Sequence, residues 1–329
     1  MYLGRAAFLK RHWRWLYRVG SRESVPSPLV AVAGGRVVGH GGLIPVTLRR
    51  NNEERTATWF VDFAILPEYQ RKGIGMALAQ AGMMSCPLQL GFGNEGSVGM
   101  LLKCGWETRF HTLCFRLLLR PNRHPSFQGS SMKGFAALAG LATRGVWRAR
   151  AFAGQELSAS PATPDRLAAF SDGDGGVALH VPRSSEFLHW RISTHPYSRE
   201  YFVLSLRGGR VEEGYSAIAR VVDDSGYRRL HLLALRGEPA NRHALGRFFA
   251  GDVRWAVKND IHDIVFITSD PMVAKTARWW FPVSKRLRFV CHANDSSGAD
   301  FLSGTDHMWE CLDSDFDLMH VARPGDEVQ

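Results

Sequence analysis

One order of elements in the first hundred residues constrains the fold most: a strand, a basic turn and a helix that starts on glycines. The run Thr56–Leu66 is rich in aromatic and β-branched residues, which favour strands, and Pro67 ends it. Gly73 and Gly75 follow, and we expect a helix over Ile74–Met84. A buried strand that leads through a glycine turn into a helix is typical of α/β folds with a ligand at the turn.

The turn has the chemistry of a pyrophosphate site. Glycine lacks a Cβ atom, so the main chain at Gly73 and Gly75 can approach a ligand closely. The first amides of the following helix have no partner within the helix, and the helix dipole favours negative charge there. Arg71 and Lys72 add two positive charges. We therefore predict that the amides of residues 71–75 bind an anionic ligand.

Other phosphate-binding motifs fit this turn poorly. A P-loop has a lysine and then a serine or threonine after its second glycine, whereas Met76 and Ala77 follow Gly75 here. A dinucleotide fingerprint has a third glycine three residues further on, and that position is Leu78. The turn therefore predicts an anionic ligand without defining a P-loop or a Rossmann site.

The distribution of charge also favours an anionic partner for the first third of the chain. The formal net charge of the whole chain is +10. Residues 1–125 contain 17 Lys and Arg against 7 Asp and Glu, so this stretch alone carries +10, whereas residues 186–329 contain 18 against 20 and carry −2. A basic field attracts a nucleotide, a phosphorylated cofactor, a nucleic acid or a membrane surface, although on charge alone it equally serves solubility.

Two motifs in this region resemble those of the GNAT superfamily of N-acetyltransferases. The turn itself matches the Gln/Arg-x-x-Gly-x-Gly/Ala loop of that family with the residues Gln70-Arg71-Lys72-Gly73-Ile74-Gly75. Downstream, Asn94 is followed at the family's spacing by Lys103, Gly105 and Trp106, where relatives carry an Asn and a helix that ends in Lys-x-Gly-Phe. Two motifs in the right order are more specific than either alone, and the resemblance covers about residues 25–120.

The resemblance implies an acyl-CoA co-substrate, acetyl-CoA first of all, and no metal. The central strand would splay from its neighbour to form a cleft. Main-chain amides at Ile65 and Leu66 would hold the pantetheine arm, and those of the turn would hold the pyrophosphate. The residues predicted to bind the cofactor are Ile65, Leu66, Gln70, Arg71, Lys72, Gly73, Ile74, Gly75 and Asn94.

The expected reaction is attack of an amine on the thioester, which needs a base for the ammonium proton and an acid for the leaving thiolate. Asp62 is the only carboxylate in the central strand, so we name it as the candidate base, although it also fits a solvated strand residue. The family's usual proton-donating Tyr is replaced by Leu101, which cannot donate a proton. A lone strand histidine, His111, is more simply structural.

We predict two domains and a linker. Residues 1–120 form the acyl-CoA-binding domain, residues 121–185 form a linker with a helix over Met132–Arg150, and residues 186–329 form a degenerate domain of the same type. The fold class is α/β (α+β), with two GNAT-like domains, each a mixed, mostly antiparallel twisted sheet flanked by helices. The elements that repeat the order of the first domain are Tyr201–Leu206, Val211–Val222, Leu230–Leu235, Ala244–Lys258, Ile264–Ile267 and Val273–Trp280.

The second domain lacks the glycine turn. After its long strand it has Glu238, which would repel phosphate, and Pro239, which removes an amide donor. We therefore expect that this domain has lost cofactor binding and serves as a scaffold or acceptor platform. A Trp-Arg-rich start and the run Asp313-Ser314-Asp315 loosely resemble GNAT-like proteins of bacterial polysaccharide assembly.

These observations predict an acyl-CoA-dependent N-acyltransferase that acts on an amine acceptor, with an amino sugar or a polysaccharide precursor as the first candidate and another small-molecule amine or a peptide amine as the next. Two alternatives remain: a non-catalytic CoA-binding or scaffold protein, and an aminoacyl-tRNA-dependent transferase of the tandem type. We do not otherwise expect nucleic acid as a partner, and the oligomeric state is open. Five cysteines without a C-x-x-C pair, and no apolar run of membrane-spanning length, favour the cytoplasm.

Overall fold

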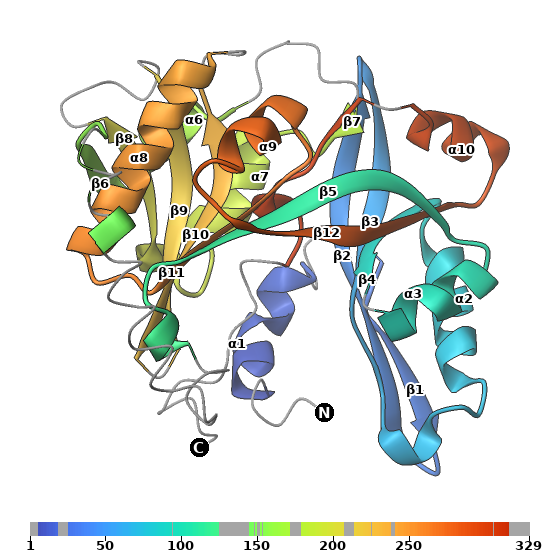
Figure 1. Cartoon of the computed structure of the whole chain (residues 1–329). Helices are drawn as coiled ribbons and strands as arrows, with labels where there is room; N and C mark the ends of the chain where they lie inside the picture. The colour runs from blue at the N-terminus through green and yellow to red at the C-terminus, as the bar shows by residue number, and fades with distance from the viewer. Residues whose placement is uncertain are drawn as a thin grey trace. The chain divides into compact units, whose positions relative to one another are not determined.

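The computed structural model describes residues 6–18, 26–93, 95–124, 145–147, 149, 152, 154–171, 179–206, 214–224, 226–237, 241–304 and 306–315 (Figure 1). The chain divides into two compact units. The first combines Met1–Thr112, Gly173–Pro182 and Arg286–Trp309. The second combines Leu113–Asp172, Arg183–Lys285 and Glu310–Gln329.

The first unit is a mixed sheet flanked by helices. Its elements are α1 (Ala6–Leu16), β1 (Leu29–Ala33), β2 (Arg36–Arg50), β3 (Glu53–Ile65), η1 (Pro67–Tyr69), α2 (Ile74–Ser85), β4 (Leu88–Gly93), α3 (Glu95–Lys103), β7 (Leu179–His180), α10 (Ser296–Leu302) and β13 (His307–Met308). Two strands, β5 (Glu107–Leu118) and β12 (Val283–Ala293), contribute residues to both units. The strand order in this unit is β13-β7-β2-β3-β4-β12-β5, with β1 on β2.

The strands β1, β2 and β3 form an antiparallel meander. Gly34 and Gly35 connect the first two strands with φ values of +56° and +76°, which is the conformation that a tight hairpin turn requires and that glycine adopts without strain. A crossover through α2 then places β4 parallel to β3, because parallel neighbours need a long connection.

Neighbouring residues on β3 build the packing on the two faces of this sheet. Phe60 packs toward α2 and α3 in a buried cluster that also contains Leu43, Ala79, Val98, Leu101, Trp106 and Val290. Trp59 points to the opposite face, because successive strand residues alternate. There its ring stacks on Phe92 at 5.1 Å between centroids and meets Trp309 edge-on at 5.7 Å. Helices α2 and α3 therefore cover one face only (Figure 1).

The second unit has the same kind of mixed, mostly antiparallel sheet. Its elements are β6 (Leu157–Pro161), α6 (Pro164–Ala168), α7 (Ser185–Leu188), η3 (His189–Ser193), η4 (Ser198–Glu200), β8 (Tyr201–Leu206), β9 (Ser216–Asp224), β10 (Tyr227–Arg236), α8 (Arg242–Lys258), β11 (Asp263–Thr268), α9 (Pro271–Ala277) and η5 (Cys311–Asp313), with η2 (Pro121–Arg123) after β5. Strands β8, β9 and β10 form an antiparallel meander, and β11 lies parallel to β10 after the α8 crossover. The predicted fold class is confirmed.

The composition of the two units differs from the linear domains that the sequence predicts. In the first unit, β4 pairs antiparallel with Arg288–Ala293 of β12, and in the second, β11 pairs antiparallel with Leu113–Leu118 of β5. Each sheet is thus completed by a strand from the other half of the chain, so no boundary at residue 120 or 186 separates them. Most of the predicted linker helix, including Met132, lies outside the described residues, although 145–147 are helical.

A buried carboxyl group lies on α8 in the core of the second unit. Asp252 is fully buried, and neither of its side-chain oxygens has a hydrogen-bond partner in the described part of the chain. Burial raises the pKa of Asp252 from its usual 3.8 to about 8, so this carboxyl group is protonated at neutral pH. Because the pKa of Asp252 is higher in the folded state than in the unfolded state, its contribution to stability is fully present below pH 3.8. That contribution is lost as the pH rises toward 8.

Replacing Asp252 by Asn should therefore make the protein more stable at high pH. We expect the free energy of unfolding of Asp252→Asn, minus that of the wild type, to increase by about 1.4 kcal/mol per pH unit between about pH 4 and 8. Urea unfolding across this range measures the difference. The exposed Asp165→Asn on α6 is the control, and a gain for Asp252→Asn that is independent of pH would contradict the prediction.

Candidate functional site

The gap between β3 and β4 is the first component of the site. The two strands pair in parallel only from Ala57 to Trp59, opposite residues 88–90, although β3 continues to Ile65 and β4 to Gly93. Beyond Trp59 the facing edges of the strands no longer form a ladder. The divergence agrees with the splayed central strand that the family resemblance implies, and it leaves main-chain groups of β3 available to a ligand.

A bulge in β3 lies beside this gap. Opposite β2, His40 faces Ala64 and Gly42 faces Val61, so Gly41 stands against two residues of β3, Asp62 and Phe63. Asp62 has a φ of +49°, in the left-handed region that L-residues adopt only rarely. Bulges often redirect a side chain next to an active site, and this one sets the direction of Asp62.

The turn after β3 is held by hydrogen bonds to β2 and to the end of β3. The amide of Leu66 donates to the carbonyl oxygen of Val38 at 2.9 Å, and the side-chain Nε2 of Gln70 donates to the carbonyl oxygen of Ile65 at 3.0 Å. Arg71 and Gly73 have positive φ values of 59° and 81°. Two residues just before α2 thus adopt the left-handed conformation, which glycine tolerates without strain and arginine adopts only rarely.

The N-terminus of α2 has no side-chain cap. Gly73 is the N-cap residue, and the first helical bond runs from the amide of Ala77 to its carbonyl oxygen at 3.1 Å. The amides of Ile74, Gly75 and Met76 are left to solvent or a ligand, and they point where the helix dipole is positive. In the second unit, by contrast, the side chain of Asn241 accepts the amide of Ala244 and caps α8 itself.

A cavity of about 680 Å³ opens at this point, in the range that small-molecule sites occupy. It lies between the end of β3, the turn, the start of α2 and one face of α3. The lining residues are Phe63, Ala64, Ile65, Gln70, Arg71, Gly73, Gly75, Met76, Gly96, Ser97, Gly99, Met100 and Lys103. It combines an apolar wall with a rim of amides and two cationic side chains.

The predicted cofactor residues divide into three groups. Those that line the cavity are Ile65, Gln70, Arg71, Gly73 and Gly75, and those that do not line it are Leu66, Lys72 and Ile74. Leu66 is a correction to the prediction, because its amide is already bonded to Val38. The ammonium group of Lys72 lies over the ring of Tyr69, 5.3 Å from its centroid. Asn94 lies outside the described residues.

Sequence reasoning missed the wall that α3 contributes. Gly96, Met100 and Lys103 follow one another at helical spacing and lie on one face of α3. That periodicity was visible in the sequence, but which face met the turn depended on the packing of α3 against α2. Lys103 places a second cation near Arg71 on the rim of the cavity.

The side chains considered for acid–base work lie in different surroundings. Leu101 lies in the buried apolar cluster, and its aliphatic side chain has no proton to donate. Asp62 accepts a hydrogen bond on Oδ2 from the hydroxyl group of Tyr17 at 3.2 Å. His40 Nδ1 donates to the main-chain oxygen of Asp62 at 3.1 Å, and burial lowers the pKa of His40 below its usual 6.5. His111 is exposed and contacts the guanidinium group of Arg286.

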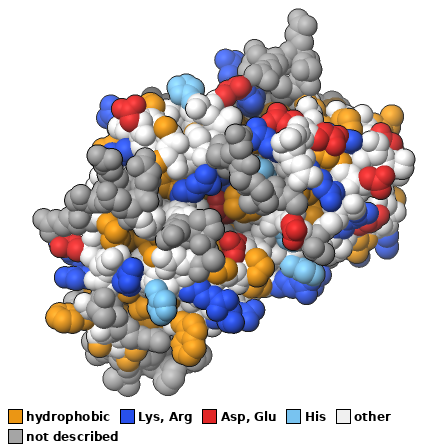
Figure 2. Space-filling view, turned by 90° about the horizontal axis from the view of Figure 1, so that it is seen from above, with side chains coloured by type: hydrophobic (Ala, Val, Ile, Leu, Met, Phe, Trp, Pro, Cys, Tyr) orange, Lys and Arg blue, Asp and Glu red, His pale blue; other side chains and the backbone are white. Residues whose placement is uncertain are grey.

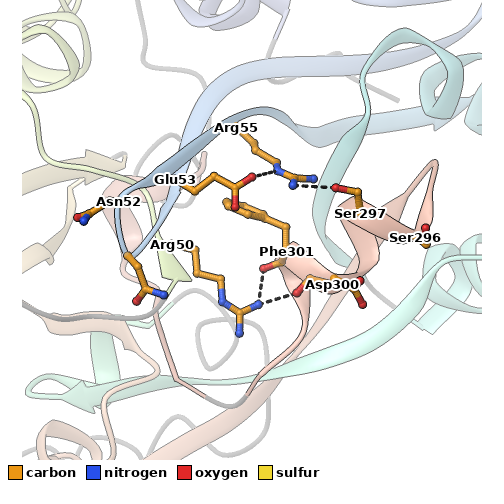
Figure 3. A pocket seen from close by; sticks show the side chains of 9 residues that line it. Arg50, Asn52, Glu53, Arg55, Ser296, Ser297, Asp300 and Phe301 are labelled. Carbon is orange, nitrogen blue, oxygen red and sulfur yellow. Dashed lines mark hydrogen bonds and ion pairs between the residues drawn. The ribbon is translucent and has the colours of Figure 1, made fainter.

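A second cavity of about 550 Å³ lies at the β2–β3 turn, against α10 (Figure 3). Its cations are engaged with the protein's own groups. Arg50 donates to the carbonyl oxygens of Asp300 and Phe301 at 2.7 and 2.8 Å. Arg55 donates to Glu53 at 2.6 Å and to Ser297 at 2.9 Å. This cavity therefore suits an anion less well than the one beside α2.

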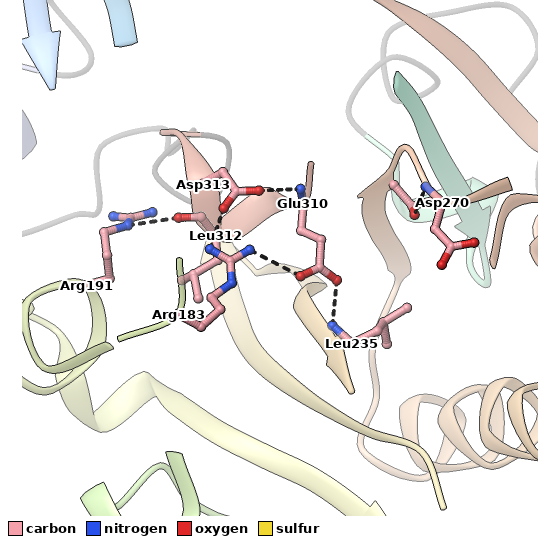
Figure 4. A network of polar contacts seen from close by, with 8 residues as sticks. Arg183, Arg191, Leu235, Asp270, Glu310, Leu312 and Asp313 are labelled. Carbon is pink, nitrogen blue, oxygen red and sulfur yellow. Dashed lines mark hydrogen bonds and ion pairs between the residues drawn. The ribbon is translucent and has the colours of Figure 1, made fainter. Parts of the chain in front are cut away.

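In the second unit, a carboxylate occupies the position that would correspond to the first-unit gap. The β9–β10 register shifts between Leu232 and Ala234, much as the β2–β3 register shifts at its bulge. One residue further on, the amide of Leu235 donates to Oε1 of Glu310 at 2.7 Å (Figure 4). The predicted repulsive residues, Glu238 and Pro239, lie outside the described residues.

A buried ionic network holds Glu310 there (Figure 4). Arg183 bridges Glu310 Oε2, at 3.2 Å, and the carboxylate of Asp313. Arg191 donates to the main-chain oxygens of Leu312 and Ser314 at 3.1 and 2.7 Å. Burial raises the pKa of Glu310 to about 7, against the opposing effect of Arg183. The amide of Leu235 is thus satisfied from within the unit.

Exposed charges of both signs are interspersed on the face drawn in Figure 2. In the first unit, for example, Arg36 lies 3.6 Å from Glu68.

Across the part of the chain that the structure describes, no helix is long and apolar enough to cross a membrane. Nor do three or more His, Cys, Asp or Glu side chains gather there in a group that could hold a metal ion.

The fold and the site together define an α/β protein with an uncapped helix start beside a gap in its sheet. Residues 5–106, which contain this site, match the sequence model of the Acetyltransferase (GNAT) family. The match supports the GNAT superfamily for this part of the chain. No curated protein sequence matches the chain.

The chain is also similar to solved structures at low sequence identity. One is a conserved protein of unknown function, a probable N-acyltransferase, from Enterococcus faecalis V583, with a TM-score of 0.51 and 10% identity over 88% of this chain and 65% of that chain. Another is a GCN5-related N-acetyltransferase from Anabaena variabilis ATCC 29413, with a TM-score of 0.48 and 11% identity over 83% of this chain and 64% of that chain. This chain thus spans less than two thirds of the length of either structure.

Replacement by alanine should lower the stability of the protein at Gly73 and raise it at Gly99. Gly73 has a φ of +81°, so Gly73→Ala should cost about 1 kcal/mol of stability, and Gly73→Asn less. Gly99 lies within α3 with open space around its Cβ position, so Gly99→Ala should add about 0.5–1 kcal/mol. Thermal or urea unfolding measures both, and equal shifts would contradict the assigned conformations.

Proposed function

We propose that the protein is an acyl-CoA-dependent N-acyltransferase that uses acetyl-CoA and an amine acceptor. The observation that carries the proposal is the uncapped start of α2 at the mouth of a cavity that runs to the unpaired edge of β3. A diphosphate needs amide donors and positive charge, and a pantetheine arm needs an extended strand edge. The match of residues 5–106 to the GNAT family supports the same chemistry.

In this proposal the cofactor lies along β3 and the turn. The pyrophosphate accepts hydrogen bonds from the amides of residues 73–76, and Arg71 and Lys103 lie beside it. Because the amide of Leu66 points to β2, the main-chain groups of Ile65 point the other way, toward the gap. The amide of Ile65 is therefore the donor that we assign to the pantetheine arm.

The proposed reaction needs an attacking amine, a base and a fate for the leaving thiolate. The acceptor nitrogen attacks the thioester carbonyl carbon, a C–N bond forms, the C–S bond breaks and the thiolate of CoA leaves. The proton that the amine loses passes to the carboxylate of Asp62. With Leu101 at the family's Tyr position, the thiolate leaves unprotonated or takes its proton from water, which a thiol of pKa near 8.5 tolerates.

The charge of the candidate base bears on the class of acceptor. The negative charge of Asp62 favours an ammonium group over a neutral nucleophile. Amino sugars and other saccharide precursors are the first acceptors to test, followed by small-molecule and peptide amines. We place the reaction in the cytoplasm, which five cysteines outside any disulfide favour.

Filling the cavity beside Gly75 should weaken cofactor binding. A Cβ atom at Gly75 would lie 3.3 Å from Met100 Sδ and 3.4 Å from Phe63 Cζ, so the larger side chain of Gly75→Leu would enter the cavity. We expect acetyl-CoA affinity, measured by calorimetry, to fall at least tenfold. Gly246→Leu on α8, where the Cβ position is open, is the matched control and should bind as the wild type does.

The same titration separates the alternatives. A wild-type chain that fails to bind acetyl-CoA would overturn both the enzymatic and the CoA-binding proposals. Binding without release of free thiol for any amine in the panel would leave a CoA-binding or scaffold protein. Turnover only with an aminoacyl-tRNA donor would identify the tandem-type aminoacyl transferase.

Removing the charge of Asp62 should slow turnover without weakening cofactor binding. General-base catalysis contributes about 10²–10⁴-fold, so we expect Asp62→Asn to lower kcat within that range while the Kd for acetyl-CoA stays unchanged. Thiol release under saturating acetyl-CoA measures kcat. Glu68→Gln, on an exposed loop carboxylate, is the control; a kcat for Asp62→Asn equal to that of this control would remove Asp62 from the mechanism.

A further inference from the structure

The side chain of Tyr17 reaches from the end of α1 to the bulge of β3. Its hydroxyl group donates to Oδ2 of Asp62 at 3.2 Å, although the two residues are 45 positions apart in the sequence. Tyr17 has no exposed surface, and its amide donates to the carbonyl oxygen of Trp13 at 3.1 Å. A buried hydroxyl group with a fixed main chain behind it holds one orientation.

A glycine on β2 makes room for this side chain. A Cβ atom at Gly42 would overlap the hydroxyl oxygen of Tyr17 and would lie 2.8 Å from its ring carbons. Any other residue at this position would therefore displace the tyrosine ring. The absence of a side chain at Gly42 thus serves the contact between α1 and the bulge.

Aromatic packing fixes the ring from its other sides. The ring of Trp13 lies 4.9 Å from that of Tyr17, edge-on, and 4.9 Å from that of His40. His40 in turn donates to the main-chain oxygen of Asp62. Helix α1 and strand β2 thus hold the two ends of Asp62, the carboxyl group through Tyr17 and the main chain through His40.

We propose that Tyr17 is the positioning residue for Asp62, holding its carboxyl group where it takes the proton of the acceptor amine. This inference rests on the proposed function. Asp62 adopts a left-handed φ that would otherwise cost stability, so the conformation persists because surrounding groups hold it. The hydroxyl group fixes the carboxylate through Oδ2, and with it the direction in which Asp62 meets the acceptor.

The Tyr17–Asp62 contact and the cofactor cavity lie on different sides of β3. Phe63 and Ile65 line the cofactor cavity on the side of α2 and α3. Asp62 contacts α1 through Tyr17, and Asp62 is not among the residues that line that cavity. The acceptor amine therefore approaches from the α1 side, while the thioester reaches the gap from the α2 side.

Kinetics of Tyr17→Phe test the proposal. Phe keeps the ring and removes only the hydroxyl group, so we expect kcat to fall about tenfold while KM and Kd for acetyl-CoA stay within twofold. Gly42→Ala, which displaces the ring instead, should lower kcat similarly. Tyr227→Phe, at a buried tyrosine of the second unit, should leave kcat unchanged.

A double-mutant cycle separates positioning from general stability. If Tyr17 acts through Asp62, Tyr17→Phe should cause no further loss in an Asp62→Asn background. An unchanged kcat in Tyr17→Phe, or losses that multiply in the double variant, would overturn the inference and leave the proposed function intact. A wild-type protein that binds acetyl-CoA but turns over no amine would overturn both.

Discussion

The hydrogen bonding of β3 determines what the first unit can do. On one side this strand pairs with β2 along nearly its whole length, and on the other it pairs with β4 only from Ala57 to Trp59. A polar strand edge inside a protein needs a partner. Under the proposed function, the unpaired stretch of β3 would bind an extended, amide-bearing ligand, and the uncapped α2 start beside it would bind an anion.

The second unit satisfies the same requirement from within. The amide of Leu235 is bonded to Glu310, and the start of α8 is capped by Asn241. Because Arg183 and Asp313 hold Glu310 in a buried network, breaking one member would leave buried charges uncompensated. Two units with similar sheets thus differ in whether their main-chain donors are left to a ligand or are occupied by the protein's own side chains.

Local chemistry was readable from the sequence, and long-range pairing was not. The end of β3 before Pro67 and the start of α2 after Gly73 each follow from the needs of a few neighbouring residues. The hydrogen bond from the Leu66 amide to Val38 depends on the register of β2, and the Tyr17–Asp62 contact depends on where α1 packs. The mixed composition of the two units escaped the prediction for the same reason, since strand alternation does not identify the partner of β4.

The pairing of β4 with residues 288–293 has a consequence for biosynthesis. While the ribosome has made only the first 120 residues, the segment that covers the outer edge of β4 does not yet exist, and bare strand edges recruit other chains. The outer edge of β4 therefore stays without this partner until the residues of β12 have been made. A shortened chain that retains the turn after β3 but ends before β12 would carry an open edge on β4, which other chains could pair with.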